Sequence, residues 1–404
     1  MNIDTIKQVI FDTAVNDNIL KITIKGDYEI YDTLKMVNNK KVKLMNATLI
    51  LEKNCKINIS NDAIALIAIL SFFSVIPRDE KCELIFPFDV SKNFIRSLSL
   101  SYILPQVIIN CHNGYVDNKM FDSENDVIVC FGGGIDSTAA KNLFDKCILV
   151  HEKPMLEGDY SLSIENVQYV STNIRQLFDV FGLPIWMSIF IVCLLYNSKY
   201  IVSGSQFSSS YLFDGIKYFP RINNQFYKVF EINDYKILPM DFLTEMINMK
   251  IVYMANEFDK TAFCSAILRK KCTRCTKCLR KYMEICVLDD KYMDELSKFK
   301  LNDSSITNLF EKDKLYFGCH FNYCVDKLLD NTINKQNDTL IKLQKLIKPH
   351  KVNVDIKFLE RYYDISLNSY PDKIKTMIKK NLVKFNVLPM TENDVKNVEN
   401  FKQQ

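Results

Sequence analysis

Hydrophobic and polar positions follow different patterns on the two sides of residue 120. Before that point, short alternating runs predict strands at 19–24, 48–51 and 84–86, and a continuous apolar run predicts a buried helix at 64–73. The polar stretch 113–125 contains no apolar run and indicates a domain boundary.

From residue 126, apolar strands and helices take turns along the chain. The pattern predicts strands at 127–131, 147–151 and 200–203, and helices at 138–144 and 184–196. Such alternation predicts an α/β fold with a doubly wound parallel sheet and helices on both faces. Ligands of such folds bind at the carboxyl ends of the strands.

The last part of the chain is polar, rich in lysine and periodic in the manner of helices. In the segment 354–382 the apolar positions with helix-like spacing are Phe358, Leu359, Tyr362, Tyr363 and Ile365. The sequence therefore predicts an α+β N-terminal domain (1–120), an α/β domain (121–290) and a mostly helical C-terminal region (291–404).

The composition is that of a globular protein, with 48% hydrophobic and 25% charged residues among 404. A net charge of +4 is too small to indicate a broad nucleic-acid surface. The apolar runs 63–76 and 183–196 are shorter than the roughly 20 residues that span a bilayer. We therefore expect buried helices there, no membrane association, and a cytoplasmic protein because no export signal is visible.

Three consecutive glycines follow the strand predicted at 127–131. Gly132, Gly133 and Gly134 allow the backbone to approach an anion closely, and the amides of a helix N-terminus favour negative charge. We expect the backbone of residues 132–135 to bind the phosphates of a nucleotide. The alternative is an ordinary strand–turn–helix connection in which Asp136 caps the helix.

The side chains after the glycines carry the remaining chemistry of this segment. Ser137 and Thr138 offer hydroxyl donors, and Asp136 is a suitable ligand for Mg²⁺ because that ion prefers a carboxylate together with phosphate oxygens. The expected nucleotide-binding segment is thus Gly132, Gly133, Gly134, Ile135, Asp136, Ser137 and Thr138.

Four of the thirteen cysteines are spaced as metal ligands, in the order C-x7-C-x2-C-x2-C. Four thiolates suit a structural Zn²⁺ site, and an iron–sulfur cluster is the alternative. The predicted ligands are Cys264, Cys272, Cys275 and Cys278. A weaker candidate for a second metal site consists of Cys319, His320 and Cys324.

The glycine segment resembles the S-G-G-x-D-S loop of the PP-loop ATP pyrophosphatases, with Gly132 in place of the first serine. Together with the cysteine spacing, residues 126–288 resemble the 7-cyano-7-deazaguanine synthase (QueC) family. The resemblance implies a ligase that uses ATP, Mg²⁺ and Zn²⁺, with Asp136 and Ser137 as catalytic residues. It also implies that His151 lies near the adenine, and that Gly204 and Ser205 lie near the nucleotide or the substrate.

The reaction implied by this resemblance is transfer of AMP to a carboxylate, such as a deazapurine acid, followed by attack of ammonia or a protein amine. Large QueC-like proteins of this build resemble those of bacterial antiviral operons, which adds a protein partner or protein substrate to the small-molecule carboxylate. The chain departs from the family because the segment 205–210 that follows Gly204 contains four serines but no acid.

Two other functions stay open at this level. One is PP-loop sulfur transfer to RNA, and the other is a nucleotide-binding scaffold without catalysis. Arg175 is a further candidate for a phosphate or substrate carboxylate, with an ordinary surface arginine as the alternative. The sequence does not set the oligomeric state, and a homodimer is one arrangement that it allows.

Overall fold

The computed structural model describes residues 6–25, 27–29, 43–45, 47–76, 81–100, 107–111, 115–116, 123–155, 166–181, 187–204, 211–214, 217–220, 230–231, 234–262, 275–299, 320–330, 337–350 and 356–402. The chain forms two compact units built from interleaved segments. Unit 1 consists of Met1–Gly132, Lys146–Val202 and Ile222–Leu238, and unit 2 of Gly133–Asp145, Ser203–Arg221 and Pro239–Gln404. This division differs from the three consecutive domains that the sequence suggests.

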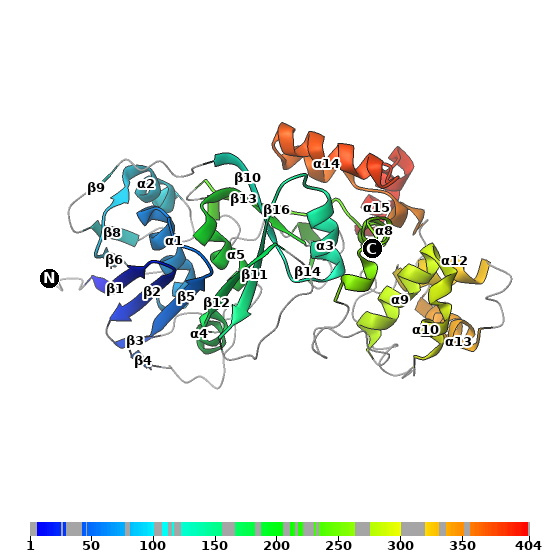
Figure 1. The fold of residues 1–404 in the computed structure, drawn as a ribbon, viewed down its shortest axis with the longest axis horizontal. Coiled ribbons are helices and arrows are strands. Elements are labelled where there is room, and N and C mark those ends of the chain that lie inside the picture. The colour runs from blue at the N-terminus through cyan, green and yellow to red at the C-terminus, as the bar shows by residue number, and fades with distance from the viewer. Residues whose placement is uncertain are drawn as a thin grey trace. The chain divides into compact units, whose positions relative to one another are not determined.

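A ten-stranded sheet forms the centre of unit 1, and the protein is therefore of the α/β class (Figure 1). The strands, in their order across the sheet, are β16 (Lys236–Pro239), β13 (Ser198–Ser203), β10 (Ser123–Cys130), β11 (Ile148–Pro154), β12 (Val167–Thr172), β5 (Thr48–Lys53), β2 (Ile19–Lys25), β1 (Lys7–Asn16), β6 (Cys82–Phe86) and β8 (Val107–Cys111). The pairs β3 (Asp27–Glu29) with β4 (Lys43–Met45), β7 (Val90–Ser91) with β9 (Tyr115–Val116), and β14 (Tyr211–Asp214) with β15 (Lys217–Pro220) form separate small sheets.

The sheet is mixed. Strands β13, β10, β11 and β12 pair in parallel with one another, and so do β1, β6 and β8. Strands β5 and β2 join the two groups, because β5 pairs antiparallel with β12 and β2, and β2 pairs antiparallel with β1. The domain boundary expected at residues 113–125 therefore lies between strands of one continuous sheet.

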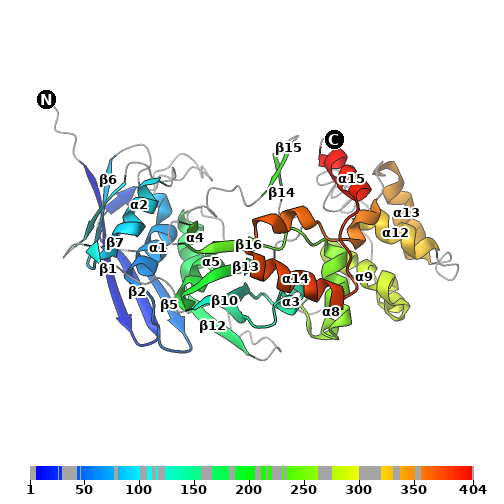
Figure 2. The ribbon, with the colours of Figure 1, turned by 90° about the horizontal axis from the view of Figure 1, so that it is seen from above.

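Helices α1 (Asn61–Ser71) and α2 (Lys92–Leu100) cover one face of β1, β2, β5 and β6 (Figures 1 and 2). Helix α1 begins where the Ser60 hydroxyl accepts the Ala63 amide at 3.2 Å. Ten of its eleven residues are buried, which confirms that the run 63–76 enters the core. The η1 turn (Phe73–Val75) ends the helix within the predicted range.

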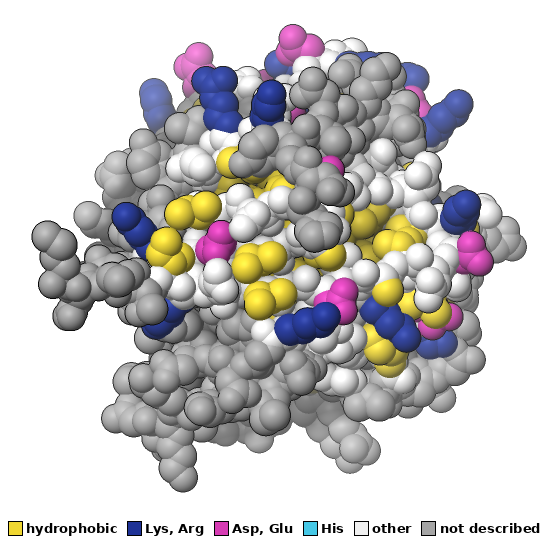
Figure 3. Space-filling model, turned by 90° about the vertical axis from the view of Figure 1, so that its left-hand side faces the viewer, with side chains coloured by type: hydrophobic (Ala, Val, Ile, Leu, Met, Phe, Trp, Pro, Cys, Tyr) yellow, Lys and Arg dark blue, Asp and Glu magenta, His cyan; other side chains and the backbone are white. Residues whose placement is uncertain are grey.

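The opposite face of these strands carries exposed aliphatic residues. Ile10 is 38% exposed and Ile108 is 47% exposed. Ile10 is paired with Ile85 of β6. At neighbouring positions, Lys25 Nζ and Asp12 Oδ2 form an ion pair at 2.9 Å. Figure 3, which views this end of the chain, shows hydrophobic side chains among lysines and acids.

The remaining helices of unit 1 match the α/β pattern of the sequence. They are α4 (Ile174–Phe181) and α5 (Ser188–Cys193), and the η3 turn (Leu194–Tyr196) continues α5. The helix predicted at 184–196 is confirmed from Ser188 onward, and its start lies outside the described residues. In the described part of the chain, no helix combines the length and apolar composition that crossing a bilayer requires.

Unit 2 is helical around α8. Its elements are α3 (Ile135–Asn142), α8 (Glu245–Met254), η5 (Phe258–Lys260), α9 (Thr276–Leu288), η6 (Asp290–Tyr292), α10 (Met293–Ser297), α12 (His320–Asp330), α13 (Asp338–Ile347), η9 (Lys348–His350), η10 (Ile356–Glu360), η11 (Asp364–Ser369), α14 (Asp372–Lys384) and α15 (Glu392–Lys402). The helical periodicity at 354–382 corresponds to two short 3₁₀ segments and then α14. Pro371 directly precedes α14, and its fixed φ suits a helix start and not the interior of one continuous helix.

Candidate functional site

The glycine turn leads into an uncapped helix. Gly133 has a φ of 72°, which is left-handed backbone that residues with a side chain adopt only at a cost. Gly134 is the N-cap of α3 and offers no side-chain acceptor. Among the described contacts, the amides of Ile135, Asp136 and Ser137 donate to no backbone carbonyl, whereas the Thr138 amide donates to the Gly134 carbonyl at 3.0 Å. The turn therefore presents amides to an anion.

Gly204, directly after β13, lies against this turn. A Cβ at Gly204 would come within 3.2 Å of the Ser137 amide nitrogen and 3.4 Å of the Asp136 Cβ. A side chain at position 204 would require the backbone at Asp136 and Ser137 to shift by a few tenths of an ångström, so glycine favours this close approach of two distant segments of the sequence. Ser205 lies outside the described residues.

The segment that precedes the cysteine cluster also contacts the turn. The Ala262 amide donates to the Gly133 carbonyl at 2.8 Å, and Gly134 and Ala262 form an isolated parallel bridge. Ala262, two positions before Cys264, therefore helps to hold the backbone conformation of the turn.

Asp136 is half-buried in the first turn of α3 and is held by α8. The Asn248 side-chain amide donates to Asp136 Oδ1 at 2.9 Å. Burial raises the pKa of Asp136, and the nearby Glu245 raises it further, whereas Lys281 and the Asn248 hydrogen bond lower it. A bound cation would instead favour the ionised carboxylate.

The two hydroxyls of the turn have different surroundings. Ser137 Oγ donates to the Gly134 carbonyl at 3.2 Å, so this hydroxyl helps to form the turn. Thr138 is fully buried, and its Oγ1 has no hydrogen-bond partner in the part of the chain that the structure describes. Thr138 Oγ1 is therefore an unpartnered polar atom beneath the surface of the turn.

Behind Asp136 lies a buried charge cluster, which we define as Glu245 of α8, Arg280, Lys281 and Glu284 of α9, and His320 of α12. Arg280 Nη2 donates to Glu245 Oε1 at 2.6 Å, and both side chains are 1% exposed. Burial lowers the pKa of Lys281, and Asp136 and Glu245 oppose this effect.

The pKa values of Glu245 and Glu284 in the buried charge cluster are shifted in opposite directions. Arg280, His320 and Lys281 together outweigh the effect of burial, so the pKa of Glu245 is lowered. Burial, strengthened by the charge of Glu245, raises the pKa of Glu284 to about 7. Sequence patterns did not indicate this cluster, although Arg280 and Glu284, spaced i,i+4 among apolar residues of one helix, are a usable signal.

His151 lies at the carboxyl half of β11 and is buried. One of its ring nitrogens, Nδ1, lies 2.8 Å from the Phe131 carbonyl, directly before the glycines. Because a carbonyl only accepts, this nitrogen carries the proton. The His151 ring meets Tyr169 edge to face at 5.7 Å between centroids.

Arg175 is used within unit 1. Its Nε lies 2.9 Å from Glu152 Oε1 and its Nη2 lies 3.3 Å from Glu152 Oε2, and Ser188 also donates to this buried carboxylate. The structure thus places the guanidinium of Arg175 in a bidentate pair with Glu152, whereas a contact with a phosphate or a substrate carboxylate stays a prediction.

The structure describes two of the four predicted zinc ligands. Cys275 is the N-cap of α9, and its Sγ accepts the Cys278 amide at 3.4 Å. Both thiols therefore lie in one helical turn, as a two-residue ligand pair requires, and the helix N-terminus favours a thiolate. Cys264 and Cys272 lie outside the described residues. Of the weaker candidate for a second metal site, Cys319 lies outside the described residues. Cys324 Sγ lies 3.9 Å from Met246 Sδ, and His320 lies with two glutamates.

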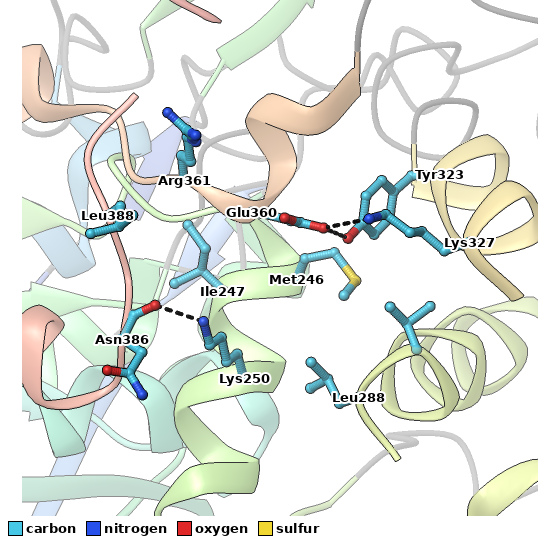
Figure 4. Close-up of a pocket in the computed structure, with 11 residues that line it drawn as sticks. Met246, Ile247, Lys250, Leu288, Tyr323, Lys327, Glu360, Arg361, Asn386 and Leu388 are labelled. Carbon is cyan, nitrogen blue, oxygen red and sulfur yellow. Dashed lines mark hydrogen bonds and ion pairs between the residues drawn. The ribbon is translucent and has the colours of Figure 1, made fainter. Parts of the chain in front are cut away.

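A cavity of about 410 Å³ opens among α8, α9, α12 and η10 (Figure 4). Met246, Ile247 and Leu288 give it apolar walls, and Glu360 at its rim pairs with Lys327 at 3.2 Å. Ile247 and Lys250 lie on the side of α8 opposite Glu245 and Asn248, because successive residues turn by about 100°. The cavity and the contact with Asp136 are thus on different faces of α8.

Comparison with known proteins gives one match. Residues 225–402 match the model of a family of unknown function, DUF6395. No curated protein and no solved structure matches the chain. The match includes α8, α9, α12 and the cavity but not the glycine turn.

Proposed function

We propose that the protein is a PP-loop ATP pyrophosphatase of QueC-like type that transfers AMP to a carboxylate. The observation that supports this most is the uncapped N-terminus of α3, which follows the left-handed Gly133 and closely approaches Gly204. Asp136 adds a carboxylate in the first turn, where Asn248 fixes its orientation.

The proposed reaction has two steps. An oxygen of the acceptor carboxylate attacks the α-phosphorus of ATP, the bond to the bridging oxygen breaks, and pyrophosphate leaves. An amine then attacks the acyl carbon of the mixed anhydride, AMP leaves, and the amine releases a proton to solvent. A carboxylate is a poor electrophile and therefore needs activation. Transfer of AMP provides this activation, because AMP is a good leaving group.

The residues of the turn act mainly on the leaving pyrophosphate. Backbone amides of residues 133–137 bind its oxygens, and the positive charge of Lys281 lies near Asp136. Asp136 suits Mg²⁺ because only one of its oxygens has a described protein donor. When bound, Mg²⁺ would neutralise charge on the phosphate oxygens.

Zn²⁺ is proposed as a structural ion at the cysteine cluster. Cys275 and Cys278 fit this assignment because they share one turn at the start of α9. The metal would hold the segment that begins at Ala262 and thereby the conformation of Gly133.

Sulfur transfer receives less support from the described cysteines. Cys130, directly before the turn, lies 3.7 Å from Cys193 on β10 and α5 of unit 1. Burial raises the pKa of Cys193 well above its usual value, so this thiol stays protonated and is a poor nucleophile.

Titration calorimetry with Mg²⁺ and a non-hydrolysable ATP analogue tests nucleotide binding. We expect the wild type to bind and Gly133→Ala to weaken binding by roughly 5- to 30-fold, because a left-handed alanine costs about 1–2 kcal/mol. Gly132→Ala is the matched control, since a Cβ there meets no atom within 4 Å. Absence of binding by the wild type, or equal losses in both variants, would contradict the proposal.

A further inference from the structure

The carboxylates of Glu245 and Glu284 and the imidazole of His320 meet at one point in unit 2. Each contributes an atom to a group whose members lie within 4.8 Å of one another. All three side chains are at most 1% exposed. They come from three different helices, α8, α9 and α12, so the meeting point joins elements far apart in the sequence.

Most ligand atoms at this point lack hydrogen bonds. Within the described structure, Glu245 Oε2, both carboxylate oxygens of Glu284 and both ring nitrogens of His320 have no hydrogen-bond partner. Buried polar atoms are normally satisfied, and each exception costs about 1–3 kcal/mol. Five such atoms in one place indicate a bound species that contacts several of them.

The charges of the buried charge cluster indicate that this species is positive. Arg280 is paired with Glu245, and Asp136 is the carboxylate that interacts most with Lys281. Glu284 is the third carboxylate, and its Oε1 lies 3.9 Å from Arg280 Nε and 3.4 Å from His320 Nδ1. Three buried or half-buried carboxylates thus share two cations, Arg280 and Lys281. Because uncompensated negative charge in a protein interior is costly, a further positive charge is required.

A proton and a metal ion are the two sources of that charge. A proton between Glu284 and His320 makes one contact and leaves Glu245 Oε2, the second Glu284 oxygen and the second ring nitrogen without partners. A divalent cation contacts all three side chains at once. In a tetrahedral site the ligand atoms lie roughly 3.3–3.6 Å apart, and the 3.4 Å from His320 Nδ1 to Glu284 Oε1 already fits.

We propose that Glu245, Glu284 and His320 bind a divalent first-row transition cation. Two carboxylates and one imidazole suit Mn²⁺, Fe²⁺ or Zn²⁺. Arg280 acts as the outer partner that holds Glu245 through its other oxygen. Because the ligands are buried, the ion is structural. It fixes α8, whose Asn248 orients Asp136 one helical turn beyond Glu245.

The test uses the full chain, without nucleotide, and Mn²⁺ as the probe, because four thiolates bind Mn²⁺ poorly. Equilibrium dialysis is expected to give one Mn²⁺ per chain, and electron spin echo spectroscopy should show coupling to one imidazole nitrogen. Glu284→Gln and His320→Gln are expected to weaken Mn²⁺ binding at least about 100-fold. Glu257→Gln is the control, since that carboxylate is partnered by Lys141 and Asn142.

The measurements on the wild type test the proposed metal site even if a variant fails to fold. Mn²⁺ at about 100 times its dissociation constant should raise the melting temperature by roughly 5 °C. Absence of Mn²⁺ binding, or binding without imidazole coupling, would overturn the proposal and leave a proton as the source of charge. Neither outcome depends on whether the glycine turn binds ATP.

Discussion

Asp136→Asn lowers the rate of ATP-dependent pyrophosphate release by roughly 100- to 1,000-fold, if the turn acts as proposed. The variant loses the charge that would hold Mg²⁺ beside the phosphates, whereas its amide oxygen still accepts from Asn248. The fold should be retained or slightly stabilised, because burial raises the pKa of Asp136 and thus disfavours its ionised form.

The measurement is the formation of AMP and pyrophosphate from ATP, with a small-molecule ultrafiltrate of cell extract as the source of acceptor. Asp145→Asn is the matched control, since Asp145 lies just beyond α3 and its side chain is 56% exposed. Wild-type rates in Asp136→Asn would exclude Asp136 from the reaction.

Arg280→Met is expected to have the largest effect on stability. Arg280 is 1% exposed and lies between Glu245 and Glu284. Its removal leaves two buried carboxylates without their main cation, and such a loss costs about 3–5 kcal/mol in the free energy of unfolding. Chemical denaturation of the variant measures this cost.

Two variants make the stability experiment specific. Arg361→Met removes an ion pair with Asp394 in which Arg361 is 36% exposed, and this change should cost at most about 1 kcal/mol. Adding Glu245→Gln to Arg280→Met should recover part of the loss, because one uncompensated charge disappears. A loss below about 1 kcal/mol for Arg280→Met would show that the guanidinium is not needed to balance the cluster.

Local patterns predicted the elements of the fold better than their association. Period-two alternation placed β2, and the continuous apolar run placed α1, because both depend on which face of a single element is buried. The pairing of β5 with β12 could not be predicted, since it joins strands more than 100 residues apart through backbone hydrogen bonds that any side chain permits.

In the candidate site, too, features set by consecutive residues could be predicted, whereas contacts between distant elements could not. The glycine turn was visible because its conformation requires particular residues at consecutive positions, and Gly133 does adopt the left-handed region. The contacts of Asp136 with Asn248, and of Glu284 with His320, join helices that are distant in sequence. Asn, Glu and His are common in helices, so nothing in the neighbouring sequence marks Asn248, Glu284 or His320 as residues of the site.

The path of the backbone limits how this protein can be divided. The chain passes from one unit to the other at 132–133, 145–146, 202–203, 221–222 and 238–239. A recombinant fragment limited to residues 225–402 would lack α3 and would therefore expose the side of α8 that carries Asn248. Conversely, a single proteolytic nick within 146–202 should place α3 and the rest of unit 2 on two separate pieces. We expect these pieces to copurify, because α3 would then be attached to α8 by packing alone.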